Sequence, residues 1–367
     1  MQLKQLARDA LLKPLQAVSG IVERRHTLPI LANVLIEPRE GGLELTATDL
    51  EMQISAMAEC PVKAGAATTV SARKLQDLLR ALPDDATLNI DVSGSKMSVR
   101  AGRSRFNLQT LAAGDYPRIS LGQDKLQTLS LPQKDLRGLF RLVEFAMAQQ
   151  DIRYYLNGLL LVVDRGSLQA VATDGHRLSW ASLPVQGEYT RQEVILPRKT
   201  VLELGKLLTD TDDPVSLDIL ASQVRFRFAN VELVSKVVDG KFPDYNRVIP
   251  VGHTKEIRVD RAVLLSAMQR ASILSNEKFR GVRLVLGNDQ LRIICTNSEQ
   301  EEAEEELEVA YHGEPLDIGF NINYLLGVLQ NLDSSEIAFA FGDANSSALV
   351  TMPGRDDYKY VVMPMRI

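Results

Sequence analysis

The sequence has few of the residues that hold disulfide-rich or metal-dependent proteins together. Only two cysteines occur among 367 residues, Cys60 and Cys295, and they lie far apart without Cys-x-x-Cys spacing. Neither a disulfide framework nor a structural zinc site is therefore predicted. The four histidines are scattered without the close spacing of paired metal ligands. We expect free thiols, no metal and no cofactor.

Long apolar runs are also missing. No run approaches the roughly 20 residues that cross a bilayer, and residues 1–8 lack the apolar stretch of a secretory signal. The composition, 45% hydrophobic and 24% charged, excludes a wholly disordered or fibrous chain. The sequence therefore predicts a cytoplasmic, multidomain globular protein without a membrane partner.

Glycine-rich phosphate loops and nucleophile elbows are absent. The chain contains no GxxxxGK[ST], GxGxxG or GxSxG motif, so nucleotide hydrolysis and serine hydrolase chemistry are not supported. Asp174 and His176 are the best candidates for an acid/base pair, but Asp49 and Asn297 stand at the corresponding places elsewhere without a histidine. We therefore expect a turn in which the Asp174 side chain accepts from backbone amides.

What the sequence does contain is a threefold repeat. Thr-Asp or Thr-Asn pairs begin at Thr48, Thr173 and Thr296, at nearly equal intervals. Ala72-Arg-Lys recurs as Pro197-Arg-Lys at the same interval. Such a long period is typical of successive domains rather than of a solenoid.

Each repeat has the same predicted order of elements. Two stripes of apolar residues at helical spacing, such as Leu75, Leu79 and Leu82, alternate with short apolar runs bounded by Gly, Asn and Asp. This pattern predicts an α+β fold made of three similar domains of about 120 residues. We place the boundaries at 1–125, 126–250 and 251–367.

Charge is distributed unevenly along the chain. The net charge is −5, yet the first domain is basic and the third is acidic, with seven glutamates within residues 299–308. Opposite charge on the two end domains favours head-to-tail contact between copies, and such contacts can close into rings.

Paired basic residues predict contact with phosphate. Arg73-Lys74 and Arg198-Lys199 each begin a predicted helix, where the amides and the helix dipole also favour anions. The loop at residues 149–155 adds polar, cationic and aromatic groups that suit nucleic acid. Residues 360–367 are apolar except for Arg366, contain two methionines, and suit a groove that accepts several peptides.

Together these stretches resemble one family. The segments at 172–178, 241–245, 273–283, 299–306 and 360–366, in this order, are similar to those of the β subunit of bacterial DNA polymerase III, the sliding clamps. The resemblance implies a DNA clamp fold and a head-to-tail homodimer that forms a six-domain ring around duplex DNA without reading its sequence. It also implies a non-catalytic processivity factor whose groove binds short peptides of the polymerase III catalytic subunit, the clamp loader, other polymerases and repair proteins.

The resemblance also implies residue roles. The residues expected to face DNA are Arg24, Arg25, Arg73, Lys74, Arg80, Gln150, Tyr154, Tyr155, Arg198 and Lys199. The residues expected to form the peptide groove are Leu156, Thr173, Gly175, His176, Arg177, Leu178, Pro243, Arg247, Val248, Asn321, Tyr324, Ser347, Val361, Val362, Met363, Pro364, Met365 and Arg366. The residues expected at the dimer contact are Lys74, Arg103, Arg105, Phe106, Leu108, Ile273, Leu274, Glu301, Glu302, Glu304 and Glu305.

Two other classes of function stay open from the residues alone. A peptide-binding scaffold with weak affinity for nucleic acid is the main alternative. An enzyme that uses His176 comes third, because no nucleophile accompanies that histidine.

Overall fold

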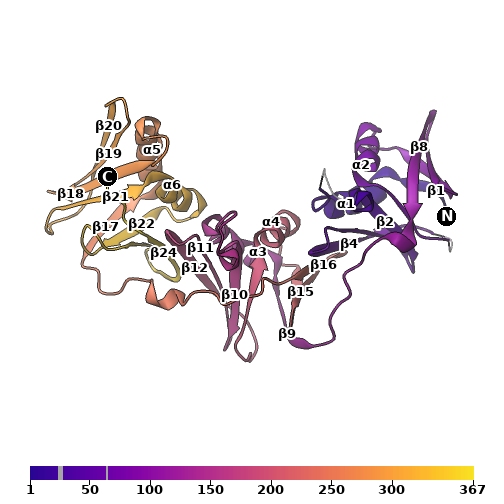
Figure 1. Cartoon of the computed structure of the whole chain (residues 1–367), viewed down its shortest axis with the longest axis horizontal. Coiled ribbons are helices and arrows are strands. Elements are labelled where there is room, and N and C mark those ends of the chain that lie inside the picture. The colour runs from indigo at the N-terminus through magenta and orange to yellow at the C-terminus, as the bar shows by residue number, and fades with distance from the viewer. Residues whose placement is uncertain (24–27, 63–64) are drawn as a thin grey trace. The chain divides into compact units, whose positions relative to one another are not determined.

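A computed structural model describes residues 1–23, 28–62 and 65–367 (Figure 1). Within these residues each repeat contributes eight strands and two α-helices, in the same order. The helices are α1 (Arg8–Ser19), α2 (Ala72–Ala81), α3 (Gln133–Arg141), α4 (Arg198–Leu207), α5 (Arg261–Ala271) and α6 (Ile322–Asn331). The predicted α+β fold and its threefold repetition are confirmed.

The chain divides into two compact units, which do not follow the repeats. The first unit comprises Met1–Lys134 and Glu203–Val237 and contains a 12-stranded antiparallel sheet, in the order β1-β6-β7-β8-β5-β2-β3-β4-β16-β15-β14-β9. Its strands are β1 (Gln2–Ala7), β2 (Asn33–Arg39), β3 (Gly42–Thr48), β4 (Met52–Glu59), β5 (Thr68–Ser71), β6 (Thr87–Ser93), β7 (Lys96–Ala101), β8 (Ser104–Ala112), β9 (Lys125–Pro132), β14 (Pro214–Leu220), β15 (Gln223–Phe228) and β16 (Val231–Lys236).

The second unit comprises Asp135–Leu202 and Val238–Ile367 and contains two antiparallel sheets. The eight-stranded sheet has the order β13-β10-β11-β12-β24-β23-β22-β17, and the four-stranded sheet has the order β20-β19-β18-β21. Their strands are β10 (Gly158–Asp164), β11 (Ser167–Thr173), β12 (Arg177–Pro184), β13 (Gln192–Pro197), β17 (Lys255–Asp260), β18 (Gly281–Gly287), β19 (Gln290–Thr296), β20 (Glu302–Glu308), β21 (Leu316–Asn321), β22 (Glu336–Phe341), β23 (Ala348–Met352) and β24 (Arg355–Val362).

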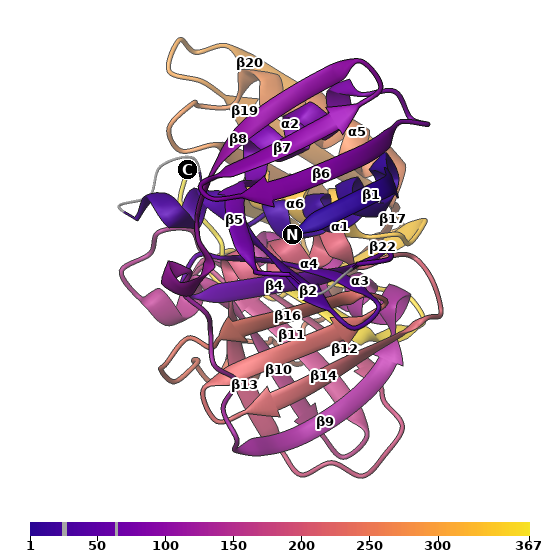
Figure 2. The same ribbon diagram turned by 90° about the vertical axis from the view of Figure 1, so that its right-hand side faces the viewer.

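Strand pairing joins successive repeats. In the first unit β4 pairs with β16, and Figure 2 shows the two strands side by side. In the second unit β12 pairs with β24 in the corresponding way. We call these pairings the first and second joints. Each joint makes one continuous sheet from strands of two repeats, so the central repeat contributes strands to both units.

The helices form because an apolar stripe on each is buried. In α2, Leu75 and Leu79 are fully buried while Arg73 and Arg80 are exposed, and the Ser71 hydroxyl caps the helix by accepting from the Lys74 amide. Helix α1 packs against α2 and against β3 and β4, and α5 packs against α6, β19 and β20. These contacts place the core between helices and sheet in each end repeat.

In the described part of the chain, no helix is both long enough and apolar enough to cross a membrane. Over the same residues, no group of three His, Cys, Asp or Glu side chains is arranged to hold a metal ion.

Candidate functional site

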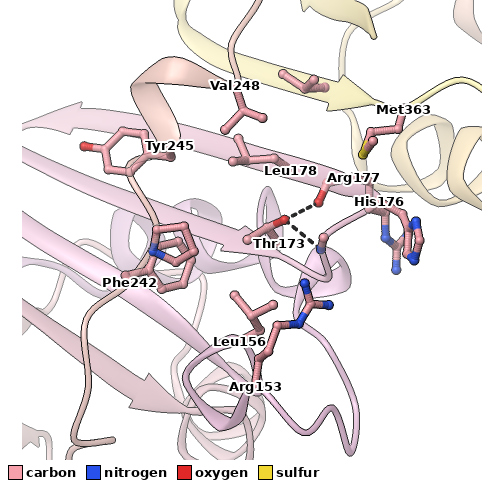
Figure 3. Close-up of a pocket in the computed structure, with 13 residues that line it drawn as sticks. Arg153, Leu156, Thr173, His176, Arg177, Leu178, Phe242, Tyr245, Val248 and Met363 are labelled. Carbon is pink, nitrogen blue, oxygen red and sulfur yellow. Dashed lines mark hydrogen bonds between the residues drawn. The ribbon is translucent and has the colours of Figure 1, made fainter. Parts of the chain in front are cut away.

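An apolar cavity of about 210 Å³ opens on the second unit (Figure 3). The turn between β11 and β12 forms one wall, and the 3-10 helix η4 (Tyr154–Leu156) forms the next. The segment at residues 242–248 and the residues at the end of β24 complete it. Leu178 and Val361 are buried in the core beneath the cavity, so its floor is held by the packing of the eight-stranded sheet.

The turn between β11 and β12 is built by the Thr-Asp motif. The Thr173 hydroxyl donates to the Arg177 carbonyl at 2.6 Å and accepts from the Gly175 amide at 3.1 Å. The Asp174 carboxylate accepts from the His176 and Arg177 amides at 2.9 and 3.1 Å. Gly175 has a φ of +89°, a conformation that suits glycine. The predicted turn is confirmed, and it occupies the carboxylate that an acid/base pair would need.

The motif builds a similar turn in the first repeat. There Thr48 donates to the Met52 carbonyl at 2.8 Å, and Asp49 accepts from the Glu51 and Met52 amides. The Thr-Asp motif therefore has a structural role in both repeats, while the cavity also needs Val361 and Met363 of the third repeat.

One rim of the cavity is cationic. The Arg153 guanidinium lies so close to Gly175 that a Cβ there would stand 2.8 Å from both Nη atoms. Asp151 holds Arg153 through an ion pair of 2.8 Å, and Arg153 also donates to the Asp174 carbonyl at 3.2 Å. The hydrogen bonds from Arg153 lower the pKa of Asp151 to about 2, so this carboxylate stays charged and keeps Arg153 in place.

Arg177 and His176 separate the apolar cavity from a polar pocket of about 350 Å³. Arg177 donates through Nε to Asp174 at 3.1 Å, and its Cζ lies 4.8 Å from the Tyr324 ring centroid. The His176 ring stacks on Tyr324 with centroids 6.3 Å apart. Burial raises the pKa of Tyr324, and the neighbouring Asp174 adds to this, so the phenol stays neutral.

Met363 lines the last wall, and residues 364–367 continue from it away from the cavity. The Met363 amide donates to the His176 carbonyl at 2.9 Å, and the Met365 amide donates to the Gly319 carbonyl at 2.7 Å. The segment therefore passes from the eight-stranded sheet to β21 of the four-stranded sheet, with Met363 at the cavity rim (Figure 3).

The structure brings many of the predicted groove residues together. Those that line the apolar cavity are Leu156, Thr173, Gly175, His176, Arg177, Leu178, Pro243, Val248, Val361 and Met363. Tyr324 lines the polar pocket instead. Arg247 is exposed and paired with Asp244, and Asn321 caps α6. The Ser347 carbonyl accepts a hydrogen bond from the His253 ring, and Val362 is fully buried. Pro364, Met365 and Arg366 follow Met363 along the segment.

Sequence reasoning missed three lining residues: Arg153, Phe242 and Tyr245. Arg153 could have been found, because Asp151, its ion-pair partner, lies two residues before it. Both lie in the loop at residues 149–155, which is predicted from the sequence to contact nucleic acid. Phe242 directly precedes Pro243, and Tyr245 follows it by two residues. Both are buried, so the sequence does not distinguish them from ordinary core residues.

The residues predicted to face DNA lie in both units. Arg73, Lys74 and Arg80 are exposed on α2. Gln150 and Tyr154 are exposed near η4, where Tyr154 and Tyr155 form an edge-to-face pair, and Arg198 donates to the Met147 carbonyl at the start of α4 beside Lys199. Arg24 and Arg25 lie outside the described residues.

The residues predicted at the dimer contact lie at two strand edges. Arg105, Phe106 and Leu108 belong to β8, and Arg103 precedes it. Glu302, Glu304 and Glu305 belong to β20, Glu301 precedes it, and Ile273 and Leu274 lie nearby in the 3-10 helix η6 (Ser272–Leu274). Glu305 already forms an ion pair of 2.6 Å with Arg270, which lowers its pKa, and Glu304 pairs with Arg292 at 2.7 Å.

Comparison with known proteins assigns the whole chain. Family models match at residues 1–120 (DNA polymerase III beta subunit, N-terminal domain), 130–244 (central domain) and 246–366 (C-terminal domain). The "Beta sliding clamp" of Pseudomonas putida is 50% identical over 366 residues, covering 99% of each chain.

Solved structures agree with these relatives. The crystal structure of the DNA polymerase III subunit beta from Pseudomonas aeruginosa has a TM-score of 0.96 at 48% identity and covers 100% of both chains. A sliding clamp of the same organism bound to griselimycin has a TM-score of 0.95 at 48% identity, covering 100% of this chain and 99% of the other.

Proposed function

Because this chain belongs to the DNA polymerase III beta subunit family, the beta sliding clamps, we propose that it encircles duplex DNA as a head-to-tail homodimer and tethers the replicative polymerase. The chain is a DNA sliding clamp and a processivity factor, not an enzyme. We further expect it to act in the cytoplasm, where bacterial DNA is replicated, with three domains that meet near residues 125 and 250.

The main support for the ring is that two of three equivalent strand pairings occur among the described residues, while the strands for the third are left without each other. The first joint pairs β4 with β16, and the second pairs β12 with β24. The third equivalent of β4 and β12 is β20, which has no strand beyond it among the described residues. The first equivalent of β16 and β24 is β8, which pairs with β5 only at residues 110–112 on that side. A third joint, between β20 of one copy and β8 of another, completes the series.

The first joint also predicts the register of the third, because β16 and β8 leave their turns without the register shift that β24 shows in the second joint. Gln53 faces Val234 in the first joint, and Leu178 faces Val361 in the second. Within the three equivalent hairpins, Gln53 faces Thr48, Leu178 faces Thr173 and Glu302 faces Thr296. Glu302 is therefore the residue of β20 that is equivalent to Gln53 in β4 and to Leu178 in β12. β8 and β16 each follow a tight turn, and their first residues are Ser104 and Val231. Asn107 and Val234 are each three residues further along, so Asn107 corresponds to Val234. Glu302 of one copy therefore faces Asn107 of the other.

This register matches the two faces of each strand. Phe106 and Leu108 are half-buried and alternate with exposed Arg105 and Asn107 on β8. On β20, Ala303 is half-buried and alternates with exposed Glu302 and Glu304. The register sets Phe106 against Ala303, so two half-buried apolar side chains face each other. It also sets the exposed Arg105 cation against the exposed Glu304 anion. A slip by one residue would reverse both matches.

Closure matters because direct contacts to DNA are weak. Phosphate contacts without base readout typically give a Kd of ~10⁻⁴ to 10⁻⁶ M, and association at ~10⁶ M⁻¹s⁻¹ then implies dissociation within about a second. A closed ring remains on DNA by topology while such contacts exchange during sliding. We assign these contacts to the exposed basic residues of α2, to Gln150, Tyr154 and Tyr155, and to Arg198 and Lys199, with Arg24 and Arg25 expected to join them.

The apolar cavity is the proposed attachment site for partners. Its floor of Leu156, Leu178 and Val361 suits apolar side chains of a short peptide, and Arg153 and His176 supply polar groups at its rim. We propose that the polymerase III catalytic subunit, the clamp loader, other polymerases and repair proteins each present such a peptide. The solved relative bound to griselimycin supplies a ready probe for this site.

The test of the ring compares circular with linear DNA. The protein is loaded onto nicked circular DNA with a cognate extract and ATP, and the DNA is then cut once by a nuclease. Release on cutting is the expected result, because a ring slides off a free end. Retention on the cut DNA would show that affinity rather than topology holds the protein, and would contradict the proposal.

A further inference from the structure

Two glycines lie on the outer face of the four-stranded sheet, where strands usually carry side chains. Gly281 begins β18, and Gly319 lies within β21. Gly281 faces Asn321 and Gly319 faces Arg283, so the two glycines occupy diagonal positions on one face. Exposed Arg283 and Asp317 share that face, while Val282, Ile318 and Phe320 fill the core on the other.

Backbone conformation does not explain either glycine, because neither has a positive φ. Glycine within a strand is unfavourable, and it marks places where another backbone approaches closely. A Cβ on Gly319 would lie 2.4 Å from the Met365 carbonyl oxygen and 2.8 Å from Ile367 Cδ1. A Cβ on Gly281 would lie 3.1 Å from Ile367 Cδ1 and 3.3 Å from Ile367 Cγ1.

The backbone that approaches is the 363–367 segment. The Met365 amide donates to the carbonyl of Gly319 itself at 2.7 Å, so hydrogen bonding and close approach occur at one residue. Pro364, which has no amide hydrogen, lies between Met365 and the other anchored residue, Met363. The side chain of Ile367 lies over both glycines, although it remains 64% exposed.

We propose that Gly281 and Gly319 are positioning residues of the peptide groove: the surface that they leave bare holds the 363–367 segment, which places Met363 at the cavity rim. This inference rests on the proposed function of the groove. Neither glycine lines the cavity, so both act through the segment. The Met363 amide on the His176 carbonyl fixes one end, and the glycines fix the other.

The two glycines should respond differently to alanine. At Gly319 the obstructing atom is a backbone oxygen, so Gly319→Ala must displace the segment. At Gly281 the nearest atoms belong to the Ile367 side chain, so Gly281→Ala displaces it less and its effect depends on Ile367. Gly287→Ala is the matched control, because Gly287 lies on the same face of β18 and its Cβ would meet only Pro315 at 3.6 Å, an ordinary contact.

The experiment measures griselimycin affinity by calorimetry on the full chain. We expect Gly319→Ala to weaken binding about tenfold or more, which corresponds to a loss of about 1.4 kcal/mol or more. Gly281→Ala should weaken binding about two- to fivefold, and Gly287→Ala should leave it unchanged. In a chain that already carries Ile367→Ala, Gly281→Ala should have no further effect, which identifies the coupling between the two residues.

Unchanged affinity in Gly319→Ala would overturn the proposal. A loss in Gly281→Ala that persists beside Ile367→Ala would also overturn it, because the cause would then be damage to the sheet. Amide hydrogen exchange reads the segment without any ligand: Gly319→Ala should speed exchange at Met365, and an unchanged rate contradicts the inference. If the wild-type chain binds no griselimycin, the groove assignment fails, while the exchange result still decides the role of the glycines.

Discussion

The guanidinium of Arg177 contacts the ring of Tyr324 and also that of Phe145, with its Cζ 4.8 and 5.6 Å from the two centroids. Asp174 accepts from its Nε, and the Phe145 carbonyl accepts from its Nη2. Arg177 is thus fixed on several sides and forms a rigid partition between the apolar cavity and the polar pocket. Its position makes Tyr324 a support of the groove from outside the cavity.

The first prediction concerns this support. Tyr324→Leu removes the ring that faces Arg177 and His176, and a cation–π contact of about 0.5–1 kcal/mol corresponds to about a two- to fivefold loss of griselimycin affinity. Tyr324→Phe keeps the ring and should bind like the wild type. Equal losses in both variants would show that the hydroxyl matters instead of the ring.

Two valines close together in sequence test the location of the groove. Val248 lines the cavity, whereas Val251 is 90% exposed and does not line it. Val248→Asp should lower griselimycin affinity about five- to 150-fold, because even an uncharged polar group without a partner in an apolar cavity costs about 1–3 kcal/mol. Val251→Asp introduces the same charge and should have little effect. Similar losses in both would move the binding site elsewhere.

The proposed third joint can be trapped covalently. In a Cys60→Ser background, Asn107→Cys with Glu302→Cys places two thiols directly opposite each other and should give disulfide-linked dimers under mild oxidation. Asn107→Cys with Glu306→Cys puts the second thiol on the same face but four residues out of register, and it should not cross-link. Non-reducing electrophoresis separates the outcomes, and efficient linkage in the second pair would refute the register.

Asp218 should matter for stability because its carboxylate is buried in the first unit. Lys125, Thr128 and Arg225 contact it at 2.5–2.8 Å, and Arg227 lies at 3.4 Å. Asp218→Asn leaves these cations without their shared anion. Because the cations are partly exposed, we expect a loss of about 3 kcal/mol, the lower end for breaking a buried ion pair. Thermal unfolding and exchange at β9 and β14 amides measure it, with Asp212→Asn, at an exposed pair, as control.

The same carboxylate predicts a pH dependence. Burial alone would raise the pKa of Asp218, but the hydrogen bonds from Lys125, Thr128 and Arg225 outweigh it and lower the pKa from 3.8 to about 2. A lowered folded-state pKa stabilises the fold above the unfolded value, and this contribution disappears as the pH falls through the folded value. The stability gap between wild type and Asp218→Asn should thus be constant above about pH 5 and shrink toward pH 2. A gap that widens on acidification would contradict the assignment.

The sequence predicted the elements better than their connections. The apolar stripes of α2 and α6 and the Thr-Asp turns follow from local spacing, so they could be found without coordinates. The joints could not, because the pairing of β4 with β16 depends on edges distant in sequence and leaves no local signal. β20 escaped notice as a strand because glutamates occupy both of its faces, and only Ala303 and Leu307 show the alternation.

The candidate groove was found largely by resemblance, and its omissions have physical causes. Phe242 and Tyr245 look like core residues in a sequence because they are core residues that also reach the cavity. The roles of Gly281 and Gly319 depend on what lies above them, which spacing along one strand does not reveal.

The joints finally bear on where a closed assembly would come apart. The first and second joints connect strands of one polypeptide, so their partners remain at a high effective concentration even after local separation. The third would connect separate polypeptides, and its two copies in the dimer would be sensitive to dilution. In a tandem fusion of two copies, a single unlinked contact between β20 and β8 would remain, and its opening would not depend on dilution. The rate of that opening could be measured as a unimolecular rate constant.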